Sequence, residues 1–231
     1  GETGKAAMEL PAIWLLPQRQ CASMVREVIG WDLIERAMAD KRGLILLTPH
    51  LGCWEVSAQY FSLHYPLTVL YSTPKVASLD FLMREGRNRP SMKSVPADIA
   101  GVRILYRALQ RGEAIGILPD QVPGSGEGEW TAFFGRAAYT MTLAMRMARA
   151  RNAPVLAAFA ERLPRGEGYR IFVEALPDEG AGETPERCMN RAIEKLIRRC
   201  PTQYLWSYNR YKTPAGMETP ASGDPQVNLP A

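Results

Sequence analysis

Two short runs of successive apolar residues limit the folds open to this chain most strongly. They are GLILLTP (43–49) and AIGILPD (114–120). A strand with one exposed face alternates apolar and polar residues, whereas these runs are apolar at consecutive positions, so both of their faces are predicted to be buried. Such strands are typical of parallel sheets that carry helices on both faces.

The remaining pattern alternates strands with helices. Further strands are predicted at 67–72, near Ser94–Val95, at 154–162 and at 168–176, the last two as antiparallel neighbours. Helices are predicted in pieces over 5–40, broken at Pro11 and Pro17, and at 53–64, 100–112, 140–153 with Thr140 as cap, and 185–200. The alternation predicts a single α/β domain over residues 1–213, with a mostly parallel central sheet flanked by helices. A Pro/Gly-rich, polar tail over 214–231 is expected to be disordered.

Composition supports one sizeable globular domain. The chain has 231 residues, 46% of them hydrophobic and 23% charged, which argues against wholesale disorder. Its net charge of +4 is too small for a nucleic-acid-binding tail, but it suits anionic partners such as phosphate, acidic lipid or an acidic carrier protein. The four cysteines form no CxxC pair, which predicts reduced core thiols and no zinc site.

The sequence contains no predicted membrane-spanning segment. No stretch approaches the ~20 apolar residues that cross a bilayer, and no signal peptide is present. The chain begins GETGKAAMEL, without an initiator methionine, so an upstream segment is expected to be missing.

His50 follows the first buried strand, and Glu55 lies five residues after His50. A carboxylate in the first turn of the next helix is expected to fold back towards the imidazole, hold its tautomer and stabilise the imidazolium. The histidine would then take a proton from a hydroxyl nucleophile. Spacing alone favours a plainer interpretation, a satisfied histidine at a strand end and an ordinary acid near a helix N-terminus. Asp120, which ends the third clear strand, is a second titratable group at a strand end.

Two other stretches leave alternatives open. Arg84, Arg87 and Arg89 could grip a phosphate, or could simply form a solvated helix face. LPDQVPGSGEGEWTAFFG (118–135) lacks GxxxxGK[ST] and is predicted to be a mobile loop or lid. Its aromatic residues could belong to the core or could line an apolar groove for an acyl chain. No GxSxG is present, which leaves a serine hydrolase with little support.

Four stretches together resemble a known family. TPHLGCWE resembles the HxxxxD/E motif of the glycerolipid acyltransferase superfamily. The chain is more closely similar to the late acyltransferases of lipid A biosynthesis, the lauroyl and myristoyl transferases. The stretches are LLTPHLGCWE (46–55), LMREGRNR (82–89), GILPDQVPGSGEGEWTAFFGRAAYTMT (116–142) and QYLWSYNRYK (203–212). The resemblance covers roughly residues 5–213.

The resemblance implies a role for each matching residue. His50 matches the general base and Glu55 its acidic partner. Arg87 falls where the family places an arginine thought to meet the acceptor's phosphate, with Arg84 and Arg89 as alternatives in register. Asp120 matches an acidic residue tied to activity, and Phe133, Phe134 and Gly135 belong to the same motif and shape the site. The reaction also needs donors for the oxyanion, which we expect from backbone N–H groups near Gly52 or from a basic side chain.

The resemblance also implies the reaction. A fatty acyl chain would pass from acyl-(acyl carrier protein) to a hydroxyacyl group of a phosphorylated lipid A precursor, without metal or cofactor. The expected place is the cytoplasmic face of a bacterial inner membrane, where family members usually have an N-terminal membrane helix. Another lipid acceptor, such as an amino lipid or a mannosylated lipid, stays open, and so does a catalytically silent lipid-binding module. Acyl-chain length, acceptor position and oligomeric state are not predicted.

Overall fold

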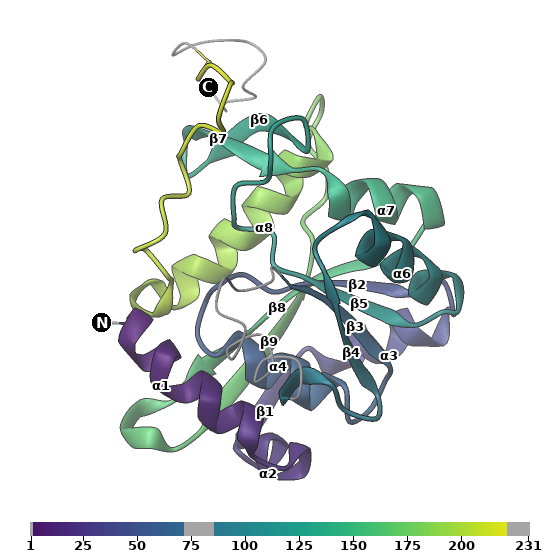
Figure 1. Cartoon of the computed structure of the whole chain (residues 1–231), viewed down its shortest axis with the longest axis vertical. Helices are drawn as coiled ribbons and strands as arrows, with labels where there is room; N and C mark the ends of the chain where they lie inside the picture. Colours follow the sequence, from purple (N-terminus) through teal and green to yellow (C-terminus); the bar gives the residue numbers. More distant parts are fainter. Residues whose placement is uncertain (1, 72–85, 221–231) are drawn as a thin grey trace.

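The computed structural model describes residues 2–71 and 86–220 (Figure 1). The strands are β1 Val25–Ile29, β2 Leu44–Leu47, β3 Leu67–Tyr71, β4 Met92–Pro96, β5 Ala114–Ile117, β6 Gly128–Phe133, β7 Arg136–Met141, β8 Val155–Arg162 and β9 Tyr169–Ala175. The helices are α1 Glu2–Leu15, α2 Gln18–Ser23, α3 Trp31–Ala39, α4 Trp54–Phe61, α6 Ile99–Gln110, α7 Leu143–Arg151 and α8 Pro185–Arg199, with 3-10 turns η1 Pro164–Gly166 and η2 Pro201–Gln203. Of the tail predicted to be disordered, residues 221–231 lie outside the described part.

Seven strands form one sheet in the order β1-β9-β8-β2-β5-β3-β4. All neighbours in this sheet run parallel except β8 and β9, which are antiparallel as predicted. The apolar runs at 43–49 and 114–120 contain the neighbouring strands β2 and β5, near the middle of the sheet. The predicted mostly parallel sheet is therefore confirmed.

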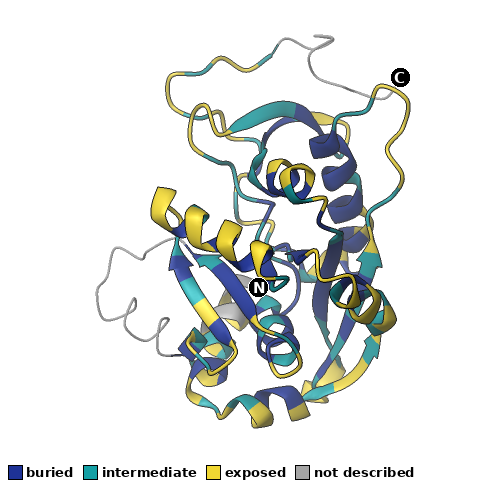
Figure 2. Ribbon diagram, turned by 90° about the vertical axis from the view of Figure 1, so that its right-hand side faces the viewer, coloured by how far each residue is buried: buried dark blue, intermediate teal, exposed yellow. Residues whose placement is uncertain are grey.

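Helices cover both faces of the sheet, and the buried residues concentrate in the strands and the inner helix faces (Figure 2). Ile45 and Leu47 of β2 pack in a cluster with residues of α6, α7 and α8. Leu44 and Leu46 point to the opposite face and pack with residues of α1, α2, α3 and α4. Because successive side chains of a strand point to opposite faces, a strand covered on both sides is apolar at every position.

The N-terminal region differs from the prediction in two places. Residues 25–29 form an edge strand, β1, parallel to β9, where a helix was expected. An edge strand exposes part of its surface, so its sequence lacks the continuous apolar signal of β2. Helix α1 also continues through Pro11 instead of breaking there. The buried side chains of Ile13 and Trp14 hold the last turn of α1 against the body, and this packing outweighs the hydrogen bond that proline removes.

Within the predicted loop or lid over 118–135, residues 128–133 form strand β6, which pairs with β7 in a hairpin, so the loop prediction was wrong there. Phe134 and Gly135 form its two-residue turn, with φ of 47° and 73°. Hairpin turns of this length need positive φ because their twist then matches that of the strands. Thr140 is a residue of β7 rather than a helix cap. Its Oγ1 accepts a hydrogen bond from Asn190 at 3.0 Å, and α7 begins only at Leu143.

A carboxyl pair lies where the hairpin packs on α8. Burial, and then the negative charge of Glu129, raise the pKa of Glu186 from 4.5 to about 7. Because the folded-state pKa is the higher one, this carboxyl lowers stability progressively as pH rises through that interval. We expect Glu186→Gln to be more stable than wild type above about pH 7 and to lose this advantage below pH 4.5. Urea unfolding across pH 4–8 measures the difference, and a pH-independent difference would contradict the assignment.

Candidate active site

The carboxyl ends of β2 and β5 carry matching extensions. Leu47 pairs with Ile117 in the parallel register. Thr48-Pro49-His50 continues one strand and Leu118-Pro119-Asp120 continues the other, so each titratable residue lies three positions beyond a paired residue. Because the carboxyl ends of parallel neighbours meet at one edge, His50 and Asp120 are brought together.

Asp120 holds His50 through both of its carboxylate oxygens. Oδ1 lies 2.9 Å from the imidazole Nδ1, and Oδ2 accepts a hydrogen bond from the His50 backbone N–H, also at 2.9 Å. We predicted Glu55 in this place, and that expectation about orientation was wrong. The side chain of Glu55 points from the first turn of α4 to Arg87 and Trp14. The register of β2 and β5 supplies the carboxylate of Asp120 instead.

The charge state of Asp120 fixes the tautomer of His50. Burial on its own would raise the pKa of the Asp120 carboxyl, but attraction to His50 and the hydrogen bonds from its ring and backbone outweigh burial and hold that pKa below its usual value. An ionised carboxylate only accepts hydrogen bonds, so Nδ1 carries the proton and Nε2 keeps its lone pair. The Gln121 amide Nε2 lies 3.3 Å from that nitrogen.

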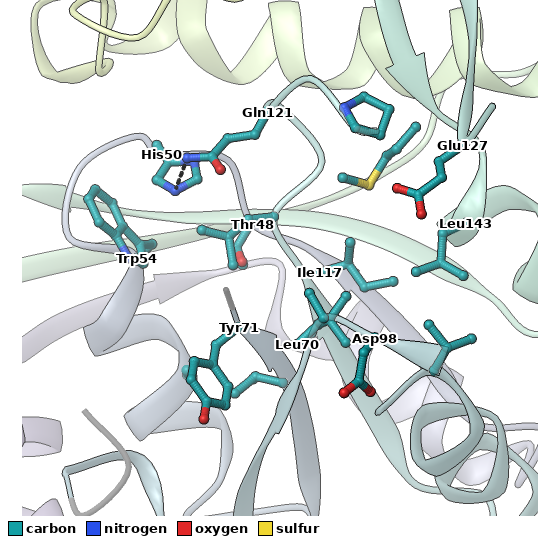
Figure 3. Close-up of a pocket in the computed structure, with 18 of the residues that line it drawn as sticks. Thr48, His50, Trp54, Leu70, Tyr71, Asp98, Ile117, Gln121, Glu127 and Leu143 are labelled. Atoms are coloured by element: carbon teal, nitrogen blue, oxygen red, sulfur yellow. Dashed lines mark hydrogen bonds between the residues drawn. The ribbon is translucent and has the colours of Figure 1, made fainter. Parts of the chain in front are cut away.

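His50 faces a large cavity, with its ring against Trp54 at 4.9 Å between centroids (Figure 3). The cavity has a volume of about 1150 Å³. It straddles the carboxyl edge of the sheet and extends away from His50 between α6, α7 and the sheet. Its apolar lining includes Leu70, Val102, Ile117, Leu118, Met141 and Leu143. A basic nitrogen at one side of a long, mostly apolar cavity suits proton abstraction from a substrate that carries alkyl chains.

Comparison with known proteins decides the family. Residues 2–213 match the family described as bacterial lipid A biosynthesis acyltransferase. The chain belongs to this family. It is 32% identical over 214 residues to the lipid A biosynthesis lauroyltransferase of Escherichia coli (strain K12), covering 91% of this chain and 69% of the relative. The palmitoleoyltransferase of that strain is 28% identical over 215 residues, with the same coverage, and its myristoyltransferase is 24% identical over 195 residues, with 80% and 58% covered.

Family membership confirms the predicted enzyme class. The protein is an acyltransferase of lipid A biosynthesis, a part of lipopolysaccharide synthesis, and the family implies a lipid acceptor. The relatives are named for three different acyl chains, so the family does not transfer a chain length to this acyltransferase. None of the helices in the described residues is long and apolar enough to cross a membrane.

Glu55 of the acyltransferase belongs to a buried network at the α1 side of the cavity. Its carboxylate accepts hydrogen bonds from Arg87 Nε at 3.0 and 3.1 Å and from Arg87 Nη2. The indole N–H of Trp14 donates to Glu55 Oε2 at 3.1 Å. A Cβ on Gly86 would overlap the Trp14 side chain, so glycine is needed beside Arg87. Glu55 therefore positions a buried arginine at the cavity wall.

Removing Glu55 is expected to leave Arg87 buried and unpaired. The two side chains are only 3% and 12% exposed, so we expect Glu55→Ala to lower the free energy of unfolding by about 3–5 kcal/mol. Urea denaturation of Glu55→Ala, Arg87→Ala and the double variant measures the coupling in a double-mutant cycle. Additive effects of the two single changes would show that the pair does not interact.

The other two arginines of the predicted phosphate cluster do not join Arg87. Arg89 Nη2 donates to the carbonyls of Trp14 and Leu16, each at 2.9 Å, so its guanidinium ties the end of α1 to the body. Arg84 lies outside the described residues. Only Arg87 of the described arginines in the cluster lines the cavity.

Gly52 has a structural role in this structure. Its N–H donates to the carbonyl of Gln203 at 3.1 Å, and a Cβ at this residue would lie 1.9 Å from the Ala160 carbonyl oxygen. The N–H of Cys53 is likewise bonded, to Ala160 at 2.8 Å. The backbone N–H groups of Gly52 and Cys53 are therefore already used within the fold.

Phe133, Phe134 and Gly135 lie at the end of the hairpin and are not among the residues that line the cavity. Phe133 is 1% exposed and packs in the core cluster with α8, while Phe134 stacks under Arg198. The core alternative for these aromatic residues is thus the one that the structure supports.

The cysteines are free and buried, as predicted, and burial raises the pKa of Cys53 to about 12, which leaves no thiolate there for nucleophilic attack.

Proposed function

We propose that this acyltransferase moves a fatty acyl chain from acyl-(acyl carrier protein) to a hydroxyacyl group of a phosphorylated lipid A precursor of the Kdo-lipid IVA type. The observation that carries the proposal is the orientation of His50. Its Nδ1 is bound to Asp120 and its Nε2 faces a cavity large enough for lipid chains. We place the reaction at the cytoplasmic face of the bacterial inner membrane.

The proposed reaction needs no covalent enzyme intermediate. His50 Nε2 takes the proton of the acceptor hydroxyl as its oxygen attacks the thioester carbonyl carbon. The tetrahedral intermediate then collapses, the carbon–sulfur bond breaks, and the imidazolium returns its proton to the thiolate that leaves. Asp120, which is 4% exposed, stabilises the imidazolium while it exists.

Both substrates must be held close together, because a general base alone contributes only ~10²–10⁴-fold in rate. The apolar lining supports the alkyl chains, since burial of each CH₂ group contributes about 0.8 kcal/mol. We assign Arg87 to a phosphate of the acceptor. Its Nε and Nη2 are held by Glu55, whereas its Nη1 has no hydrogen-bond partner within 2–71 and 86–220. A guanidinium fixed in this way can donate from its free nitrogen without losing further side-chain freedom.

The test is an assay of the purified protein with a mixed pool of acyl-(acyl carrier protein) donors. The acceptors are Kdo-bearing lipid IVA, an amino lipid and a mannosylated lipid, and mass spectrometry reads the products. We expect an added acyl chain on Kdo-bearing lipid IVA, and the mass of the product gives the chain length. Product on another acceptor alone would overturn the acceptor assignment, and binding of lipid without product would identify a silent lipid-binding module.

A further inference from the structure

Four arginines lie at or near the end of the cavity that is away from His50. Arg103 of α6 and Arg146 of α7 line that end. Arg107 lies one turn further along α6 and Arg149 one turn further along α7, and neither lines the cavity. All four are exposed on two helices that contact each other. We call these four residues the α6–α7 arginine surface.

The four arginines of this surface are not held in salt bridges by the described residues. One of them, Arg149, does lie near a carboxyl, because burial raises the pKa of Glu186 and the positive charge of Arg149 acts to lower it. None of the four arginines forms a salt bridge with any residue in 2–71 or 86–220. The two acids at the same end of the cavity have local partners. Asp98 caps α6 by accepting from the Gly101 N–H at 2.8 Å, and Glu127 accepts from the Gly124 N–H at 3.1 Å. Both carboxylates keep their negative charge in these backbone hydrogen bonds. The four exposed arginines outnumber these two lining acids, and this positive balance favours an anionic occupant.

Exposed apolar groups accompany the arginines. Ile99 lines this end of the cavity and is 74% exposed, and Tyr106, between Arg103 and Arg107 on α6, is 36% exposed. A phosphate held inside the cavity would use only the two arginines of the rim. Arg107 and Arg149 extend the positive surface onto the outside of the molecule, where only a larger partner reaches all four. Arginine and tyrosine around an apolar centre are typical of protein interfaces.

We propose that the α6–α7 arginine surface is the docking site of the acyl carrier protein, an acidic protein that delivers the chain as a thioester. The inference rests on the proposed function above. Figure 3 shows His50 and Trp54 on one side of the cavity and Asp98, Glu127 and Leu143 on the other, with Leu70 and Ile117 between them. A thioester arm that enters between Arg103 and Arg146 thus follows an apolar path to His50 Nε2.

The test compares two donors with the same acyl chain, the acyl-carrier protein and the small thioester acyl-pantetheine. The variant is Arg107→Glu with Arg149→Glu, which reverses two charges outside the cavity lining. We expect its KM for the acyl-carrier donor to rise about ten-fold or more, with kcat/KM for acyl-pantetheine unchanged. The difference between variant and wild type should shrink at high salt, because the Debye length falls to about 3 Å at 1 M.

The control is Arg19→Glu, a single charge reversal on α2, which packs on the opposite face of the sheet; its charge change is half that of the double variant. It should leave both KM values unchanged. An equal KM for the acyl-carrier donor in the double variant and wild type would overturn the docking site. So would a variant that loses binding to phosphatidylglycerol vesicles, or activity towards the glycolipid, equally with both donors, because the surface would then bind membrane or acceptor. Failure of the proposed function itself differs, since wild type would then form no product from either donor.

Discussion

Replacing His50 by alanine is expected to reduce acyl transfer to background. The Nε2 nitrogen of His50 is the basic group that faces the cavity beside Trp54, and Asp120 holds it in the tautomer that can accept a proton. Loss of a general base costs on the order of 10²–10⁴-fold in rate. The measurement is the initial rate of product formation by the purified variant, with circular dichroism and urea unfolding to confirm that it is folded.

His64 provides the matched control for this change. It is the second histidine of the chain, and its ring packs near those of Trp31 and Tyr60 instead of lining the cavity. His64→Ala removes the same number of atoms and is expected to retain a kcat close to that of wild type. Full activity in His50→Ala would show that another group takes the proton, and the proposed reaction would fail with it.

Replacing Asp120 by asparagine is expected to cost nearly as much as losing the histidine. The amide can donate to Nδ1, which places the ring proton on Nε2 and removes the lone pair that accepts the substrate proton. It also removes the negative charge that stabilises the imidazolium. A change of this kind lowers kcat by on the order of 10⁴-fold in the serine protease triad, and we expect about 10²–10⁴-fold here. Because the pKa of Asp120 is held below its usual value, the wild-type carboxylate is charged throughout a neutral assay range.

Glu55→Gln separates this assignment from the one that sequence spacing suggests. The carboxylate of Glu55 is bonded to Arg87 and Trp14, so its loss should disturb stability and acceptor binding before it disturbs proton transfer. We expect a raised KM for the acceptor with a smaller loss in kcat than in Asp120→Asn. A larger loss of kcat in Glu55→Gln than in Asp120→Asn would return the role of histidine partner to Glu55.

Part of the fold was predictable because strands that are buried on both faces have apolar residues at consecutive positions. The consecutive apolar residues of β2 and β5 require cover on both faces, and that requirement leads to a parallel sheet between helices. The prediction of strands failed where this apolar pattern is weaker. The edge strand β1 is partly exposed, and the hairpin β6–β7 follows a glycine-rich stretch that has the composition of a loop. Its turn depends on positive φ at Phe134, which sequence favours only at the following glycine.

The candidate site shows the same division at the level of single side chains. Sequence placed His50 and Asp120 at strand ends, and the two Pro-containing extensions of equal length were a readable signal. Strand order was not readable, because β3, β4 and α6 intervene in sequence between strands that are adjacent in the sheet. Without that order, the nearer carboxylate in sequence, Glu55, seemed the natural partner of the histidine.

The sequence by itself determined the fold class, the family and the histidine that faces the cavity, because hydrophobic pattern and motif are local properties of the chain. Only the tertiary structure decided which carboxylate holds that histidine, what Glu55 binds, and where four unpaired arginines gather. These depend on the register of parallel strands and on the packing of helices distant in sequence. The parallel pairing of Leu47 with Ile117 carries Asp120 to the imidazole of His50. Glu55, in the first turn of α4, is held by Arg87 and the indole of Trp14.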